Sequence, residues 1–118
     1  MNNIKLFESK KVRTHWDAER EQWYFSVIDV IEILTDSSIP KRYWSDLKKK
    51  LQSEGSEAYE KIVRLKMEAP DGKLRETDVA DTETLLRLIQ SIPSPKAEPF
   101  KQWLAKTGYE RIEEIQDP

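Results

Sequence analysis

Positive charge is concentrated in one ten-residue stretch of this chain, and the residue types there suit binding to nucleic-acid phosphates. Residues 41–50 hold five Lys or Arg and one Asp, a local net charge of +4. Lysine and arginine bind phosphate oxygens, and arginine, lysine and serine also hydrogen-bond to base edges in the major groove. The stretch therefore predicts a DNA-binding surface formed by Lys41, Arg42, Ser45, Lys48 and Lys49.

Two smaller basic groups are further candidates for phosphate contacts. Lys10, Lys11 and Arg13 fall in an alternating stretch that predicts a β-hairpin arm. Lys96 and Lys101 lie at the start of a predicted helix, where free backbone N–H groups favour anions. For each basic group the alternative is a solvated surface, because basic clusters give false-positive matches to nucleic-acid patches.

Catalytic and metal-binding chemistry finds little support in the residue types. His15 is the only histidine and there is no cysteine, which excludes zinc sites of the usual nitrogen and sulfur type. Glu76, Asp78, Asp81 and Glu83 form an acidic group that could hold Mg²⁺ in a nuclease. The simpler interpretation is that Asp81 caps a helix and that Glu83 favours its dipole. We expect no enzyme, no metal and no cofactor.

Composition limits the classes of protein that remain. The chain has 118 residues, a net charge of −2, 37% hydrophobic residues and 36% charged residues, which fits one folded domain. A protein that coats DNA without specificity would be basic overall, so any DNA surface here must be local. Residues 1–11 lack an apolar signal core and no long apolar run spans a membrane, so we expect a cytoplasmic protein.

Residues 26–52 read as a helix, a short turn and a second helix, resembling a helix-turn-helix pair. Ser26 is a good N-cap, and Asp29 three positions later makes a variant of the capping box. Residues 35–38 have turn chemistry, and Pro40 suits the first turn of the next helix. Both helices have a wide apolar side, so we expect them to pack on the same core.

The second helix of this pair has an apolar side and a basic side. We expect the apolar side to be buried, and its members are Tyr43, Trp44, Leu47 and Leu51. We expect the basic side to be solvent-exposed, and its members are Lys41, Arg42, Lys48 and Lys49. A helix of this kind can pack on its own domain and still face a polyanion.

The remaining pattern predicts an α+β fold with two β-hairpins forming a small antiparallel sheet, packed with four to five helices. Residues 3–8, 11–16, 23–25, 61–68 and 73–79 are the expected strands. Residues 69–72 (APDG) form a strong hairpin turn. Asp81 or Thr82 should cap a further helix, and a last helix around Phe100 should end at Gly108 as its C′ residue. We expect Phe100, Trp103 and Leu104 to pack on the helix at 85–89.

Domain organisation follows from the length and from the last residues. Residues 1–118 are expected to form a single domain. The sequence stops at residues 113–118 (EEIQDP), within an acidic helical pattern. We therefore expect it to be the N-terminal fragment of a longer protein whose C-terminal domain is missing.

Several motifs spread over the chain resemble one known family. The motifs are Trp23–Val30 (WYFSVIDV), Tyr43-Trp44 with Leu47-Lys48, Leu65-Lys66-Met67 leading to Asp71-Gly72-Lys73, Thr77–Thr82 (TDVADT) and Leu85–Trp103 (LLRLIQSIPSPKAEPFKQW). Together they resemble the Bro-N domain, the N-terminal domain of baculovirus repeated-ORF proteins and phage antirepressors. Residues 109–118 (YERIEEIQDP) are similar in particular to the bacterial DNA-damage-inducible protein D group.

The resemblance implies a DNA-binding regulatory module of phage or mobile-element origin, usually followed by a variable C-terminal domain. It implies duplex DNA as the partner but does not identify the residues that contact it. The alternative is a protein-interaction module of the antirepressor type, which would bind a repressor without strong DNA affinity. A homodimer is compatible with either function.

Overall fold

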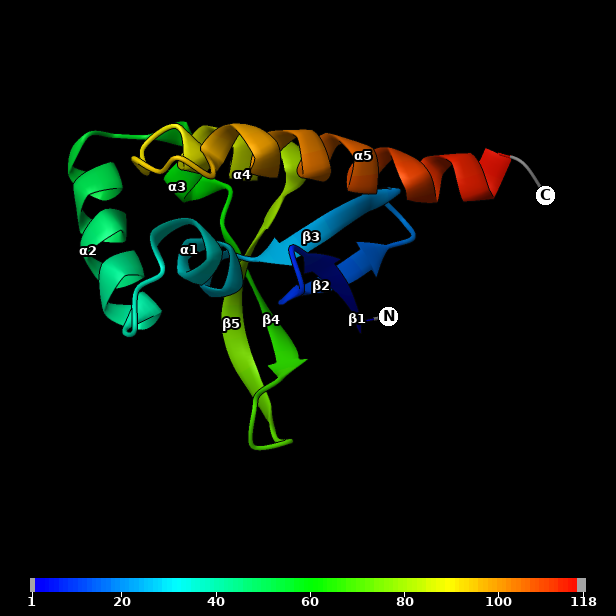
Figure 1. Ribbon diagram of the computed structural model, residues 1–118, viewed down its shortest axis with the longest axis horizontal. Helices are drawn as coiled ribbons and strands as arrows, with labels where there is room; N and C mark the ends of the chain where they lie inside the picture. Colours follow the sequence, from blue (N-terminus) through cyan, green and yellow to red (C-terminus); the bar gives the residue numbers. More distant parts are fainter. Residues whose placement is uncertain (1, 117–118) are drawn as a thin grey trace.

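The computed structural model describes the backbone of residues 2–116 and the side chains of residues 4–107 (Figure 1). Within this part of the chain, five strands form one antiparallel sheet that packs with five helices. The elements in chain order are β1 (Asn2–Phe7), β2 (Lys10–Asp17), β3 (Gln22–Ser26), α1 (Val27–Thr35), α2 (Pro40–Ser53), α3 (Glu57–Glu60), β4 (Val63–Glu68), β5 (Leu74–Asp81), α4 (Thr82–Ile89) and α5 (Ala97–Gln116). The predicted α+β class is confirmed.

The sheet has the strand order β1-β2-β3-β5-β4, with every neighbouring pair antiparallel. The two hairpins predicted from the sequence, β2–β3 and β4–β5, join where Tyr24 lies opposite Asp81. The first strand adds a third hairpin, because β1 pairs with β2 through a turn in which Glu8 and Ser9 have positive φ angles of 49° and 69°. Positive φ at both positions matches the twist that a two-residue hairpin needs.

The main core lies between one face of the sheet and the helices. Strand residues alternate between the two faces, so Val12, Thr14 and Trp16 of β2 all point into this core and are buried. Phe25 and Phe100 are both fully buried there, one from β3 and one from α5. A smaller cluster of Tyr24, Met67 and Val79 is buried on the other face.

The helix pair at 26–52 forms as the sequence predicts. Ser26 caps α1, its hydroxyl accepting a hydrogen bond from the Asp29 backbone N–H at 3.4 Å. Asp36 ends the helix in the left-handed conformation (φ 53°), and its N–H donates to the Glu32 carbonyl. A four-residue turn, 36–39, leads to Pro40 at the start of α2. The capping box is incomplete, because the carboxylate of Asp29 accepts hydrogen bonds from Arg13 instead.

The β4–β5 hairpin extends beyond β3 and points away from the helices (Figure 1). Its turn is the one expected at 69–72: the Gly72 N–H donates to the Ala69 carbonyl, and the Ala69 N–H to the Lys73 carbonyl, each at 2.8 Å. Gly72 has a φ of 83°, a conformation that glycine adopts without steric cost.

The last helix differs from the prediction in its length and in its contacts. Gly108 does not end α5, which continues to Gln116. Trp103 is half-buried and contacts strands rather than only the α4 helix: its ring packs edge-on against Phe7 and Phe25, and its Nε1 donates to the Leu6 carbonyl at 2.8 Å. Phe100 and Leu104 are fully buried in the main core with the apolar side chains of α4. The short helix α3 was not predicted.

Candidate nucleic-acid interface

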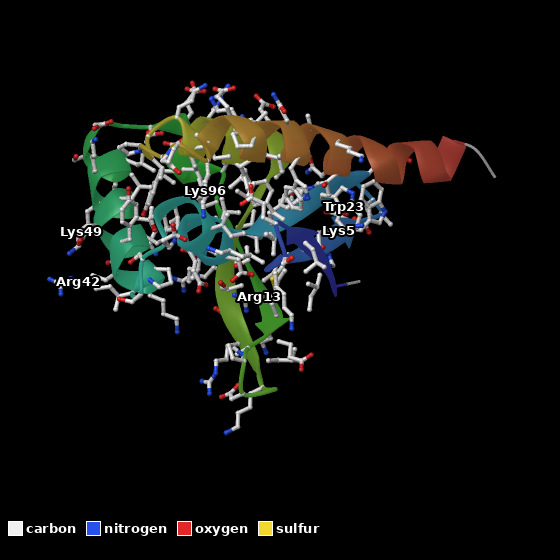
Figure 2. The ribbon with its side chains drawn as sticks, viewed as in Figure 1. Lys5, Arg13, Trp23, Arg42, Lys49 and Lys96 are labelled. Carbon is white, nitrogen blue, oxygen red and sulfur yellow. The ribbon has the colours of Figure 1, made fainter. Side chains whose placement is uncertain are left out.

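Helix α2 lies at one end of the molecule and exposes most of its predicted basic side (Figure 2). Trp44, Leu47 and Leu51 are buried against the core. The residues predicted to contact DNA that are exposed on this helix are Lys41, Arg42, Ser45 and Lys49. Arg42 and Lys49 point away from the body of the domain, as Figure 2 shows. We call these four residues the α2 basic face.

Within the described part of the chain, the cations of the α2 basic face have no acidic partner. No ion pair joins Lys41, Arg42 or Lys49 to a described carboxylate. Repulsion among clustered cations destabilises the folded domain unless a polyanion or counterions neutralise the charge. The cluster therefore offers charge that is available to phosphates.

The start of α2 carries a second unfavourable feature. Its N-cap residue, Ile39, makes no side-chain hydrogen bond, and no acidic residue lies in the first turn. Lys41 and Arg42 lie there instead, although the positive end of the helix dipole disfavours cations. Pro40 has no backbone N–H, and the N–H groups of Arg42 and Tyr43 donate to the Ile39 carbonyl at 3.1 and 3.3 Å, so a phosphate here would be held by the two cationic side chains.

Lys48 departs from the predicted exposure. Its side chain is only 30% exposed, because its ammonium group turns toward the sheet and lies 2.9 Å from Oδ2 of Asp78 on β5. The same carboxylate oxygen accepts a hydrogen bond from the Trp44 indole at 2.7 Å. Lys48 therefore helps to hold α2 on the sheet, while Lys49, one residue later, faces solvent. Tyr43, predicted to be buried, is only half-buried.

Asp78 is the anchor of this contact. Burial acts to raise the pKa of the Asp78 carboxyl, but hydrogen bonds from Trp44 and Lys48 and the charges of Lys48 and Arg64 outweigh it and place the pKa below its usual range. Asp78 belongs to the acidic group considered for Mg²⁺, and Asp81 of that group caps α4 by accepting from the Thr84 N–H at 2.8 Å. Among the described residues, no three such side chains gather as metal ligands.

The basic residues at the start of β2 have different surroundings. The Lys10 ammonium lies 2.8 Å from Asp36 in the α1–α2 turn, and Lys96 reaches the same carboxylate at 3.4 Å. The hydrogen bond from Lys10, followed by that from Lys96, lowers the pKa of Asp36. These contacts tie the β2 hairpin and the start of α5 to the turn that precedes α2. Lys11 is exposed and has no ionic partner among the described residues.

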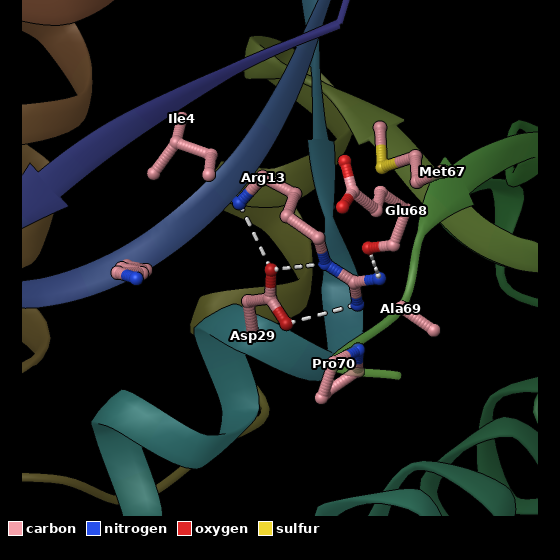
Figure 3. Close-up of a pocket in the computed structure, with 8 residues that line it drawn as sticks. Ile4, Arg13, Asp29, Met67, Glu68, Ala69 and Pro70 are labelled. Atoms are coloured by element: carbon pink, nitrogen blue, oxygen red, sulfur yellow. Dashed lines mark hydrogen bonds and ion pairs between the residues drawn. The ribbon is translucent and has the colours of Figure 1, made fainter. Parts of the chain in front are cut away.

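The guanidinium of Arg13 is held inside the domain by three groups, of which Figure 3 shows the Asp29 carboxylate and the Glu68 carbonyl. Its guanidinium binds both carboxylate oxygens of Asp29, at 2.9 and 3.0 Å, and also bonds to the Ser26 hydroxyl and the Glu68 carbonyl. The side chain is 22% exposed. The bidentate pair joins β2 to α1 with fixed geometry. Sequence reasoning missed this pairing because Asp29 was assigned to the capping box.

The predicted site residues thus form two groups rather than one patch. One group is the α2 basic face, and the other comprises Lys10, Lys11 and Arg13 at β2. The link between them is Asp36, which follows α1 and binds Lys10. The strand histidine, His15, is half-buried.

The comparisons with known proteins identify the family of this chain. A family model described as the BRO family, N-terminal domain, matches residues 11–110. The chain therefore belongs to the Bro-N family, a family of non-catalytic domains associated with DNA binding in phage and baculovirus proteins. Neither curated proteins nor solved structures gave a significant match. No helix in the described part of the chain has the length and apolar character needed to cross a bilayer.

Proposed function

We propose that this domain binds duplex DNA through the α2 basic face and acts as a regulatory module. The observation that carries the proposal is the contrast between the cations. Lys10, Arg13 and Lys48 are paired within the domain, whereas those of the α2 basic face are exposed without described acidic partners. The family association with DNA binding supports the same conclusion.

Within the proposed interface, the contacts divide by position on the helix. Lys41 lies in the first turn of α2 and would bind a phosphate through its ammonium group. Arg42, Ser45 and Lys49 lie three or four residues apart on the outward side, so they would face the groove, where they can bond to phosphates or base edges. Lys11 on β2 is exposed and could add a phosphate contact beyond the helix, whereas Lys10 is held by Asp36.

The net charge of −2 argues for a modest rather than a tight interaction. Phosphate contacts dominate non-specific affinity, and this chain offers only a few unpaired cations on one side. We infer that the domain contributes to DNA affinity within a larger protein.

A fluorescence-anisotropy titration with labelled duplex DNA at low salt tests the proposal. Replacing Arg42 and Lys49 together by Ala removes two of the outward cations, and we expect affinity to fall by tenfold or more, at about 1 kcal/mol or more for each lost charged contact. The matched control replaces Lys61 and Lys106 by Ala, two exposed lysines on other elements. Equal losses in both variants would show that only total charge matters.

The alternative function is a protein-interaction module of the antirepressor type. It requires a surface suited to a protein rather than to phosphates, and it expects no measurable binding to duplex DNA even at low salt.

A further inference from the structure

One acidic residue lies in the middle of the exposed side of α2. Asp46 follows Arg42 by four residues and precedes Lys49 by three, so helical periodicity places all three on the same outward row. All three residues are exposed, and Arg42 and Lys49 point away from the domain in Figure 2. The outward row of this helix therefore carries a carboxylate between two cations.

The Asp46 carboxylate has no structural role within the described part of the domain. Arg42 and Lys50 each lie four residues from it, a spacing at which ion pairs form on helix surfaces. Among the side chains that the structure describes, no ion pair joins Asp46 to either cation. The helix runs from Pro40 to Ser53, so Asp46 caps neither end. Neither capping nor pairing accounts for this residue.

A carboxylate on this row opposes the binding of phosphates. Repulsion between like charges about 4 Å apart in water weakens binding by roughly fivefold, and by more where water is excluded. An interface that bound only the DNA backbone would therefore bind more tightly with a neutral residue at position 46. The carboxylate suits close approach to DNA where it meets a hydrogen-bond donor of a base instead of a phosphate.

The exposed side of α2 has the layout of a helix that lies in the major groove. The major groove admits an α-helix and presents base edges to it. Arg42, Asp46 and Lys49 occupy the centre of the exposed side, where they would meet base edges. At about 100° per residue, Lys41 and Lys50 lie on opposite flanks of this row, where they would meet the phosphates of the two strands.

Two bases present an amino donor in the major groove, and cytosine suits a carboxylate better. Cytosine presents its N4 amino group, whereas adenine presents its N6 amino group beside the N7 acceptor, which repels a carboxylate. Carboxylates accordingly accept from cytosine N4, and arginine binds O6 and N7 of guanine. The rise along the helix from Arg42 to Asp46 is about 6 Å, close to two base-pair steps of about 3.4 Å each.

We propose that Asp46 determines base specificity by accepting a hydrogen bond from the N4 amino group of a cytosine, while Arg42 binds a guanine about two base pairs away. The proposal rests on the proposed function, because it requires α2 to lie on duplex DNA. Asp46 then acts in the opposite sense to its basic neighbours: it lowers the affinity for DNA in general and raises the preference for one base. Selectivity of this kind, rather than tight binding, suits a domain with a net charge of −2.

The test is selection from a pool of duplexes with a randomised central segment, followed by fluorescence anisotropy on single-base variants of the selected duplex. Wild type should prefer cytosine over thymine at one position by about fivefold or more. Asp46→Asn should change the preference at this position to adenine, because an asparagine amide binds N6 and N7 of adenine. Asp46→Ala should lose the preference and bind unselected duplex about two- to fivefold more tightly than wild type.

Glu19→Gln is the matched control, because it removes an exposed carboxylate in the turn between β2 and β3, away from α2 (Figure 1). It should keep the wild-type base preference. DNA binding that depends on Arg42 and Lys49, with the same base preference or none in wild type and both Asp46 variants, would overturn the role of Asp46 and leave the proposed function standing. Failure of wild type to bind any duplex at low salt would overturn both.

Discussion

At the scale of single residues, the structure separates cations that hold the domain together from cations that remain available. Lys48 and Lys49 are neighbours in a basic run, yet Lys48 binds Asp78 and Lys49 faces solvent. Helical periodicity predicts that residues 41, 42, 45 and 49 are outward, but it cannot predict which acid on another element reaches a flanking lysine. The same limit explains Arg13, whose partner Asp29 comes from a helix sixteen residues later.

Replacing Asp78 tests the residue-scale account of how α2 is held. Asp78→Ala leaves the buried Trp44 indole N–H and the Lys48 ammonium without an acceptor, and should cost about 2–4 kcal/mol of unfolding free energy. Asp78→Asn keeps an acceptor for Trp44 and loses only the charge, so it should cost about 1–2 kcal/mol. Urea unfolding measures both. Equal losses of unfolding free energy in the two variants would show that Asp78 stabilises the domain through its charge alone and not through the hydrogen bond from Trp44.

The pH dependence of this difference has a definite sign. The pKa of Asp78 is lower in the folded than in the unfolded chain, because its hydrogen bonds and neighbouring charges outweigh burial. Its ionised form therefore contributes stability fully above the unfolded pKa of about 3.9, and that contribution is lost as the pH falls through the lower folded pKa. The advantage of wild type over Asp78→Asn should be constant near neutral pH and shrink below about pH 4.

At the scale of elements, local signals in the sequence predict most boundaries. Ser26 and Asp81 cap their helices, Pro40 begins α2, and the 69–72 turn forms as expected. Each of these depends on side-chain chemistry within a few residues of the boundary. The predicted end of α5 is wrong. Gly108 was expected to be the C′ residue, but the helix continues past it to Gln116.

Trp103 shows how a long-range contact escapes a periodicity argument. Its spacing from Phe100 places it correctly on the inner side of α5, but its strand partners are distant in the sequence: Leu6 on β1 lies 97 residues away, and Phe25 lies on β3. Sequence spacing identifies which residues share a face, and the strand order decides what that face meets. Trp103 also covers the outer edge of β1, because its indole N–H donates to the Leu6 carbonyl.

Trp103→Ala should destabilise the domain without acting on the α2 basic face. The half-buried ring contacts Phe7 and Phe25, so its removal should cost about 2–4 kcal/mol and lower the melting temperature. Trp103→Phe keeps most of the packing and loses the hydrogen bond to the Leu6 carbonyl, at about 1 kcal/mol. Calorimetry measures both. A folded Trp103→Ala with wild-type melting but no DNA binding would make Trp103 a contact residue.

At the scale of the whole molecule, the total charge does not reveal the proposed DNA-binding surface, the α2 basic face. The net charge is −2, yet α2 presents the exposed cations Lys41, Arg42, Lys49 and Lys50, none of which has an ion-pair partner among the described residues. The α+β class and the family follow from patterning and from motifs spread along the chain. Which of the predicted cations are paired within the domain follows only from the three-dimensional arrangement, since all of them look equally available in the sequence.

The salt dependence of DNA binding tests the central claim most directly. If Lys41, Arg42 and Lys49 each neutralise one phosphate, log K should fall with log salt at a slope of about −3, from about −0.9 for each contact on duplex DNA. The Arg42→Ala and Lys49→Ala double variant should flatten the slope by about two units, while Lys48→Ala should leave it unchanged. A slope that the double variant leaves unchanged, or that Lys48→Ala flattens equally, would contradict the assignment of the interface to the α2 basic face.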